Sequence, residues 1–156
     1  MSCNCGRGIQ TYRNGTSIIF YATGKFHMPA DSSNIFNGLT ALTAINLGGV
    51  SMDTTAVVNA ANIFANCIGL TTLDLSGMNL QNVQNLSAAF YGCTNLISLS
   101  TNGILTSTAL TNISDLFNSC TSLTSIDVTW INTTNVSEYV SVFYNCSALT
   151  TLNVSS

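Results

Sequence analysis

The chain has 156 residues, enough for one domain with a core but too few for two ordinary domains. Charged residues make up only 6% of it, where about 25% is usual, so Ser, Thr and Asn must supply a nearly uncharged surface that favours assembly. No Lys or Arg lies after Lys25 and no acid lies before Asp31, which excludes a nucleic-acid partner for most of the chain.

Residues 1–30 differ from the rest of the chain. An Asn-Gly turn signal at residues 14–15 precedes alternating and aromatic residues, which predicts a strand or hairpin that caps the domain. Cys3, Cys5 and His27 would supply three of the four ligands of a zinc site, but the Cys-x-Cys spacing is unusual for structural zinc and a fourth ligand is missing. We therefore predict no metal and no cofactor, and favour mobile thiols or an intermolecular disulfide.

No apolar run approaches the ~18 residues of a membrane span. The longest early run, residues 18–22, is also shorter than the core of a signal peptide. We therefore expect no membrane insertion and see no export signal. Three routes stay open: the chain acts where it is made, it leaves the cytoplasm by assembly or lysis, or it lacks an original leader.

Residues 31–156 repeat with a period of about 26 residues, which is typical of a solenoid. The shared pattern is Phe-x-x-Cys-x-x-Leu-x-x-Leu-x-Leu. In the first unit, Phe36 is followed by Leu39 in place of the cysteine. The residues predicted to form the structural core of the other units are Phe64, Cys67, Phe90, Cys93, Phe117, Cys120, Phe143 and Cys146.

Each repeat contains two periodicities in succession, and the change between them predicts its secondary structure. Val83, Leu86, Phe90 and Cys93 are spaced three or four apart, as in the apolar stripe of a short helix. The strand part of a repeat is illustrated by residues 72–76, which alternate between polar and apolar, as in a strand with one buried face. Such a unit cannot bury its apolar face alone, so we predict an α/β solenoid of about five rungs with a parallel β-sheet.

The stretch LTTLDLSGMNL at residues 70–80 matches the leucine-rich repeat pattern LxxLxLxxNxL, except that Met78 stands in place of Asn. With the Phe-x-x-Cys-x-x-Leu motif, residues 35–156 resemble the BspA-like leucine-rich repeats of bacterial and protist surface proteins. The resemblance implies a leucine-rich repeat fold and an adhesive or structural role with varied protein partners. The Asn is also replaced in other units, so no Asn ladder is assumed there; the replacements are Val50, Ile104 and Ile131.

Cysteines that recur at the same position of successive repeats suggest a row of metal sites, a series of disulfides or a column of the hydrophobic core. Stacked rungs place equivalent positions about 4.8 Å apart with parallel side chains, whereas a disulfide needs converging Cβ atoms about 3.8 Å apart. Leu39 occupies the same column, and a site that accepts Leu is a core site in which Cys acts as a small hydrophobe. Cys93 has no basic residue in its repeat to lower its pKa, so no nucleophile is predicted.

Asp74 and Asp127 share one outward strand column at a separation of about 9 to 10 Å, the outer limit for an inverting glycosidase pair. A flat polar surface offers no cleft that would raise either pKa, and His27 has no evident serine or acid partner. We therefore predict no catalytic residue. The whole column is a candidate binding surface that consists of Asn46, Asp74, Ser100, Asp127 and Asn153.

A column just past the strand holds Gly49, Gly77 and Gly103 in three units and Trp130 in the fourth. Glycine there indicates a turn with positive φ or a close backbone approach. Trp130 has two interpretations that the sequence leaves open. Either it packs on its neighbour in a changed turn, or it is an exposed aromatic contact of the kind enriched at interfaces.

The printed sequence stops at Ser156, directly after a strand and without a polar capping unit. An uncovered last rung would expose Leu149, Leu152 and Val154 together with an open strand edge. We expect something to cover this end. An end-to-end contact between two copies would be isologous and close as a dimer, whereas a head-to-tail contact could grow a fibre.

The leading hypothesis is a non-enzymatic structural or adhesive component of a surface or particle assembly, of the virion decoration or fibre type. It places the protein on an extracellular surface or a virion, with protein partners, as a homo-oligomer or larger assembly. The alternative is a ligand-binding adhesion module of a larger secreted cell-surface protein. A third class, a carbohydrate-active enzyme, would require activity that is lost when both Asp74 and Asp127 are changed, and we expect none.

Overall fold

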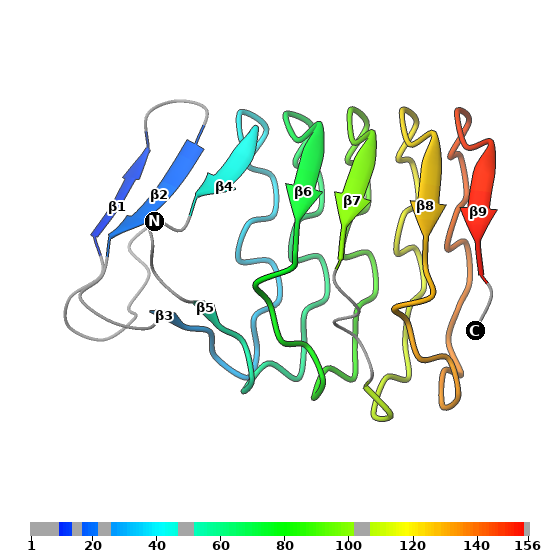
Figure 1. Ribbon diagram of the computed structural model, residues 1–156, viewed down its shortest axis with the longest axis horizontal. Coiled ribbons are helices and arrows are strands. Elements are labelled where there is room, and N and C mark those ends of the chain that lie inside the picture. Colours follow the sequence, from blue (N-terminus) through cyan, green and yellow to red (C-terminus); the bar gives the residue numbers. More distant parts are fainter. Residues whose placement is uncertain (1–9, 14–16, 22–25, 47–51, 102–106, 155–156) are drawn as a thin grey trace.

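In the computed structural model, short strands follow one another along one side of a solenoid and tight turns along the other (Figure 1). The structure describes residues 10–13, 17–21, 26–46, 52–101 and 107–154. The strands are β1 (Gln10–Arg13), β2 (Ser17–Tyr21), β3 (Phe26–His27), β4 (Ala44–Asn46), β5 (Met52–Asp53), β6 (Thr72–Asp74), β7 (Ser98–Ser100), β8 (Ser125–Asp127) and β9 (Thr151–Asn153).

The strands of successive rungs run parallel and in register. Strand β6 pairs with β7, and β8 pairs with β9, so that Leu73 lies opposite Leu99 and Ile126 opposite Leu152. In β6 and β8 the middle residue is buried and its two neighbours are exposed, which confirms the predicted alternation in these strands. Strands β4 and β7 continue the same row beside β6 and β8 (Figure 1).

The N-terminal strands extend this row by one hairpin. Strands β1 and β2 pair antiparallel, as the Asn-Gly signal predicts, although turn residues 14–16 lie outside the described part. Strand β2 pairs in parallel with β4, and β3 pairs in parallel with β5. The hairpin therefore adds two strands beyond β4. The division of the chain into a cap and a solenoid at residue 30 stays a prediction.

The segments predicted as short helices are not helical, and the described residues contain no helix. Five turn segments take their place, at residues 31–39, 59–67, 85–93, 112–120 and 138–146. Each has two residues with positive φ, four positions apart, and a left-handed residue interrupts the series of i to i−4 bonds that a helix needs. These residues are Asn34, Gly38, Asn62, Asn66, Ala88, Gly92, Asp115, Ser119, Ser141 and Asn145.

Backbone hydrogen bonds in the turn segments alternate between two kinds. One amide closes a turn onto the third residue before it, as when the Cys67 N–H donates to the Phe64 carbonyl at 3.2 Å. The next amide donates to the following rung, as when the Phe64 N–H donates to the Ala89 carbonyl at 2.9 Å. A helix would satisfy its own amides, whereas these segments depend on their neighbours. Stacking is therefore part of how each rung forms.

The core is a set of continuous columns that run through the rungs. The rings of the five repeat phenylalanines, from Phe36 to Phe143, stack with centroid separations of 5.2, 5.7, 5.2 and 5.6 Å. A second column consists of leucines that are fully buried or nearly so: Leu42, Leu70, Leu96 and Leu123. Each of these side chains packs on the equivalent side chain of the neighbouring rung. The repeat in the sequence therefore produces a core that repeats from rung to rung.

Candidate functional site

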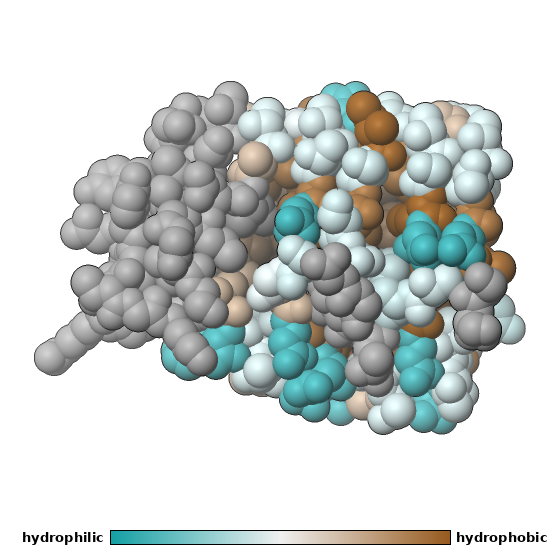
Figure 2. All heavy atoms as spheres, in the orientation of Figure 1, coloured by the Kyte–Doolittle hydropathy of each residue, from teal (hydrophilic) through white to brown (hydrophobic). Residues whose placement is uncertain are grey.

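The outward residues of the strands form an exposed and nearly uncharged polar surface. In Figure 2, the part of this side that is coloured by hydropathy is mostly pale, with separate teal patches and narrower brown areas. The exposed members of its two columns are Thr72, Ser98, Ser125 and Thr151, and Asp74, Ser100, Asp127 and Asn153. Asn46, the first residue of the predicted binding column, lies in β4, but its side chain is outside the described part.

The two aspartates of this surface are bound to their own turns. The Asp74 carboxylate accepts a hydrogen bond from the Ser76 amide at 2.8 Å, and that amide holds the pKa of Asp74 below its usual value. The Thr129 hydroxyl donates to Asp127 at 2.6 Å and likewise lowers the pKa of Asp127. The Asn153 amide group donates to the other Asp127 oxygen at 2.9 Å. A glycosidase acid needs a raised pKa, so this pair lacks its general acid.

The cysteine column lies in the interior, where each thiol donates to a backbone carbonyl of the preceding rung. The four Sγ atoms are 3.0 to 3.1 Å from the repeat phenylalanine oxygens. Burial raises the pKa of Cys67 to about 11 and that of Cys93 to about 12, so both thiols stay protonated at neutral pH. Leu39 heads the column, and none of the described residues forms a preceding turn segment whose carbonyl would need a donor.

Trp130 is a packing residue, and its interpretation as an exposed contact is wrong. The side chain is 5% exposed, and its Nε1 donates to the Asp127 carbonyl at 2.8 Å. It lies in the interior among side chains of earlier rungs that include Leu75 and Met78. The expectation for the glycine column also fails at Gly77, which has no positive φ and no heavy atom within 4 Å of a built Cβ. Gly49 and Gly103 lie outside the described residues.

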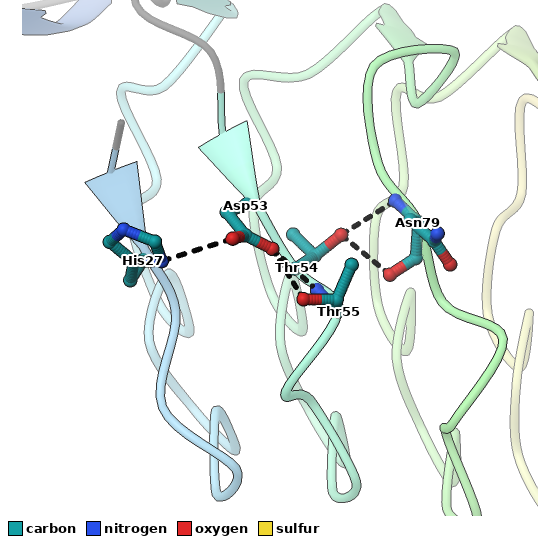
Figure 3. Close-up of polar contacts among 5 residues, drawn as sticks. All are labelled: His27, Asp53, Thr54, Thr55 and Asn79. Carbon is teal, nitrogen blue, oxygen red and sulfur yellow. Dashed lines mark hydrogen bonds and ion pairs between the residues drawn. The ribbon is translucent and has the colours of Figure 1, made fainter. Parts of the chain in front are cut away.

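His27 has an acidic partner that sequence reasoning missed. Its Nδ1 lies 3.0 Å from Asp53 Oδ2, and Asp53 also accepts a hydrogen bond from the Thr55 hydroxyl at 2.6 Å (Figure 3). The neighbouring Thr54 hydroxyl is hydrogen-bonded to the backbone of Asn79 in the next rung. An exposed pair of this kind contributes on the order of 0 to 1 kcal/mol. His27 and Asp53 are one repeat period apart in the sequence, so an alignment of residues at this spacing could have predicted the pair.

A further column, which sequence reasoning missed, consists of the first residue of each turn segment. It joins successive rungs by parallel bridges through Asp31, Asn59, Asn85, Asn112 and Glu138. The Asn59 amide group donates to Asp31 at 3.1 Å, and the Asn112 amide group donates to Glu138 at 2.6 Å. An Asn ladder therefore exists, but at a different place from that of the leucine-rich repeat pattern. Each member precedes the phenylalanine of its own rung by the same interval, so the register of the repeat contains this column as well.

The last described rung is more exposed than the rungs before it. In the fourth turn segment Ile113 is 7% exposed, whereas its equivalent in the fifth, Tyr139, is 66% exposed. Of the residues predicted for this end, Leu149 is half-buried, Leu152 is 42% exposed and Val154 is 66% exposed. An apolar cavity of about 380 Å³ opens here, lined by Ile113, Val128, Ile131, Thr133, Val136, Tyr139, Val142, Phe143 and Val154.

Stacked rungs with in-register strands and leucine columns define a leucine-rich repeat solenoid. The description "BspA type Leucine rich repeat region" matches residues 31–150 with 6 copies. The chain belongs to this family. A crystal structure of a T. pallidum leucine rich repeat protein (TpLRR) is similar at a TM-score of 0.52 and 20% identity, over 92% of this chain and 66% of that one. This likeness shows a shared fold. No curated protein matched.

No helix among the described residues has the length and apolar character needed to cross a membrane. Nor do three or more His, Cys, Asp or Glu side chains of the described part gather into a group that could hold a metal ion. Cys3 and Cys5, for which mobile thiols or a disulfide were predicted, lie outside these ranges.

Proposed function

We propose that this chain is a non-enzymatic adhesive or structural module that binds protein partners within a surface or particle assembly. Membership of the BspA-type family supports the coarser part, protein interaction or adhesion, typically at a surface or outside the cell. The observation that carries the proposal is the outward strand surface, which is exposed, regular and held rigidly by stacked rungs.

The chemistry of this surface suits a protein partner. Its outer columns offer hydroxyl and amide groups, which lose less free energy on desolvation than charged groups do. The two acids, Asp74 and Asp127, already accept hydrogen bonds from their own turns. Between Asp31 and Ser156 the chain has no Lys or Arg, so attraction to anionic partners is weak. Shape and neutral hydrogen bonds would therefore select the partner more than charge does.

The test is binding of the purified chain to cell surfaces and to extracellular matrix proteins. Ser100→Arg places a bulky charge in the middle of the strand surface and should weaken binding about tenfold or more, a loss of about 1.4 kcal/mol. Gln81→Arg makes the same charge change at an exposed residue outside the strands and should bind like the unmodified chain. Equal binding by both variants would exclude the strand surface, and no binding by any of them would overturn the adhesive role.

A finer form of the proposal is assembly into a particle, as a virion decoration or fibre, by self-association. The low charge of the chain supports it. Solution mass over a range of concentrations, measured with reductant present, distinguishes the sources of partners. A mass above that of one chain supports a homo-oligomer. A single-chain mass favours the second candidate, an adhesion module of a larger cell-surface protein, in which other chains supply the contacts.

A further inference from the structure

The residues that directly follow the repeat phenylalanines form a column on the turn side of the solenoid. Its members are Asn37, Ala65, Tyr91, Asn118 and Tyr144. Tyr91 is 39% exposed although rungs stack on both of its sides, whereas Phe90 before it is buried. Its hydroxyl has no hydrogen-bond partner among the described residues. A large aromatic side chain with a spare polar group therefore stays at the surface in the middle of the solenoid.

Tyr91 and Tyr144 leave the backbone in the same way. The N–H of each donates to the carbonyl three residues before it, at 3.0 and 3.1 Å. Their own carbonyls accept from the preceding rung, from Asn66 at 2.6 Å and from Ser119 at 2.8 Å. Tyr144 is 68% exposed, and a further rung beside it would leave it at the surface, as the flanking rungs leave Tyr91. The two rings therefore project from equivalent places on one face.

The two tyrosines are two rungs apart. The phenylalanines before them, Phe90 and Phe143, stack on either side of Phe117 at centroid separations of 5.2 and 5.6 Å, with nearly parallel planes. The rungs therefore follow one another at a regular step, and two steps correspond to about 10 Å at the usual spacing of strands. Asn118 lies between the tyrosines, so the column alternates aromatic rings with a side-chain amide.

Side-chain amides lie beside these rings. Asn66 is exposed, and its Oδ1 lies 2.6 Å from a Cβ built on Gly92, the residue after Tyr91. The Asn66 side chain therefore lies over Gly92, in space that any other residue there would fill. Asn118 donates one amide hydrogen to Asp115 at 2.7 Å, and the other has no acceptor among the described residues. A ligand on this face would find both donors and acceptors next to the rings.

We name Asn66, Tyr91, Asn118 and Tyr144 the tyrosine column. Its chemistry suits a neutral sugar chain. The negative face of an aromatic ring attracts the C–H groups of a sugar ring, and side-chain amides pair with sugar hydroxyls as donors and as acceptors. No Lys or Arg lies after Lys25, so an acidic or sulfated sugar would gain no opposite charge here.

The spacing of the rings favours a β-1,4-linked chain. Successive sugars of such a chain are turned over relative to one another, so every second sugar presents the same face to a straight surface. The length of its disaccharide repeat is comparable with two rungs of the solenoid. Tyr91 and Tyr144 would then stack on alternate sugars, while Asn118 pairs with hydroxyls of the sugar between them.

We propose that the tyrosine column is a binding site for neutral β-1,4-linked polysaccharides, which lie along the solenoid axis on its turn side. The site binds its ligand without hydrolysis. This inference goes beyond the proposed function and is independent of it, because the tyrosine column shares no residue with the strand surface. The ligand class includes glucans and their N-acetylated counterparts, since both have the same linkage and the same alternation of faces.

The first test is calorimetric titration of the unmodified chain with three soluble hexasaccharides. Cellohexaose and chitohexaose have the β-1,4 linkage, and maltohexaose is the α-linked control. At least one β-linked probe should bind saturably, and maltohexaose should bind at least tenfold more weakly. A preference between the two β-linked probes shows whether the natural ligand has N-acetyl groups. Equal binding of maltohexaose, or no binding of either β-linked probe, would overturn the proposal.

Variants of the chain then locate the site. Tyr91→Ala removes one stacking ring and should weaken binding of the preferred probe about tenfold, whereas Tyr91→Phe keeps the ring and should retain most of the affinity. Tyr139→Ala is the matched control, because Tyr139 is also exposed but lies outside the tyrosine column. It should bind like the unmodified chain. Equal losses in Tyr91→Ala and Tyr139→Ala would exclude the tyrosine column as the site.

A double variant tests the alternation itself. Asn118→Tyr combined with Tyr144→Asn keeps the number of tyrosines in the column but places the two rings in adjacent rungs. With an unfolding midpoint close to that of the unmodified chain, this variant should lose about as much affinity as Tyr91→Ala. Unchanged affinity would refute the match between rungs and sugars. Ser100→Arg should leave sugar binding unaffected, so a failure of the strand-surface proposal and a failure of this one can be told apart.

Discussion

Replacing Ala88 by glycine should stabilise the protein. Ala88 has φ of 53°, and the equivalent residues in the other turn segments are Asn34, Asn62, Asp115 and Ser141. The left-handed conformation costs alanine about 1 to 2 kcal/mol because of its Cβ. Glycine removes that cost but loses about 0.5 to 1 kcal/mol through the greater freedom of the unfolded chain. The free energy of unfolding should rise by about 0.5 to 1 kcal/mol.

The adjacent residue provides a matched control. Ala89 is fully buried and has no positive φ. Ala89→Gly removes a buried methyl group, worth about 0.8 kcal/mol, and adds the same unfolded-state freedom. It should lower the free energy of unfolding by about 1 to 2 kcal/mol. Urea denaturation followed by circular dichroism measures both variants against the unmodified chain.

The two substitutions distinguish the observed turns from the helix that the spacing of apolar residues predicts. In a helix, Ala88→Gly would lower the free energy of unfolding by about 1 kcal/mol, because glycine has a poor helix propensity. A loss of that size at Ala88, similar to the loss at Ala89, would refute the left-handed turn. Opposite signs at the two neighbouring residues can arise only if their backbones differ as described.

Two further outcomes are expected from the core columns. Phe90 stacks between two other rings, so Phe90→Ala should lower the free energy of unfolding by about 3 to 5 kcal/mol, whereas Tyr91→Ala at the surface should cost under about 1 kcal/mol; similar losses by denaturation would contradict the stack. Because burial raises the pKa of Cys93 to about 12, the unfolded chain loses this proton first, and stability that is full below about pH 9 should fall above it by about 1.4 kcal/mol per pH unit for this thiol. Denaturation at pH 8 and pH 10 should show a smaller loss in Cys93→Ala, and equal losses would exclude a buried protonated thiol.

Much of the fold could be predicted because residues at equivalent positions of the repeat stack on one another in the structure. The repeats of Phe64 and Leu70 identify core positions without knowledge of the local backbone. The exposed side of the strands follows from the alternation around Leu73. His27 and Asp53 could also have been paired in this way, because they differ by one period.

The backbone of the turn segments could not be predicted from apolar spacing alone. An interval of three and four residues fits a helix, but it also fits turns with a left-handed residue at every fourth position. The signal that separates them is polar or glycine residues such as Asn62 and Asn66, which tolerate positive φ. The inward direction of the Trp130 side chain and the carbonyl that accepts from each thiol depend on neighbouring rungs, so the local sequence does not predict them.

The backbone hydrogen bonds that each turn segment donates to the following rung have an evolutionary consequence. Each turn segment donates four backbone amides to the segment after it, so the backbone contacts between neighbouring rungs are equivalent along the solenoid. Duplication or deletion of one period would leave no interior amide without an acceptor, provided that the remaining rungs keep their order. Selection can therefore change the length of such a protein in steps of one whole period.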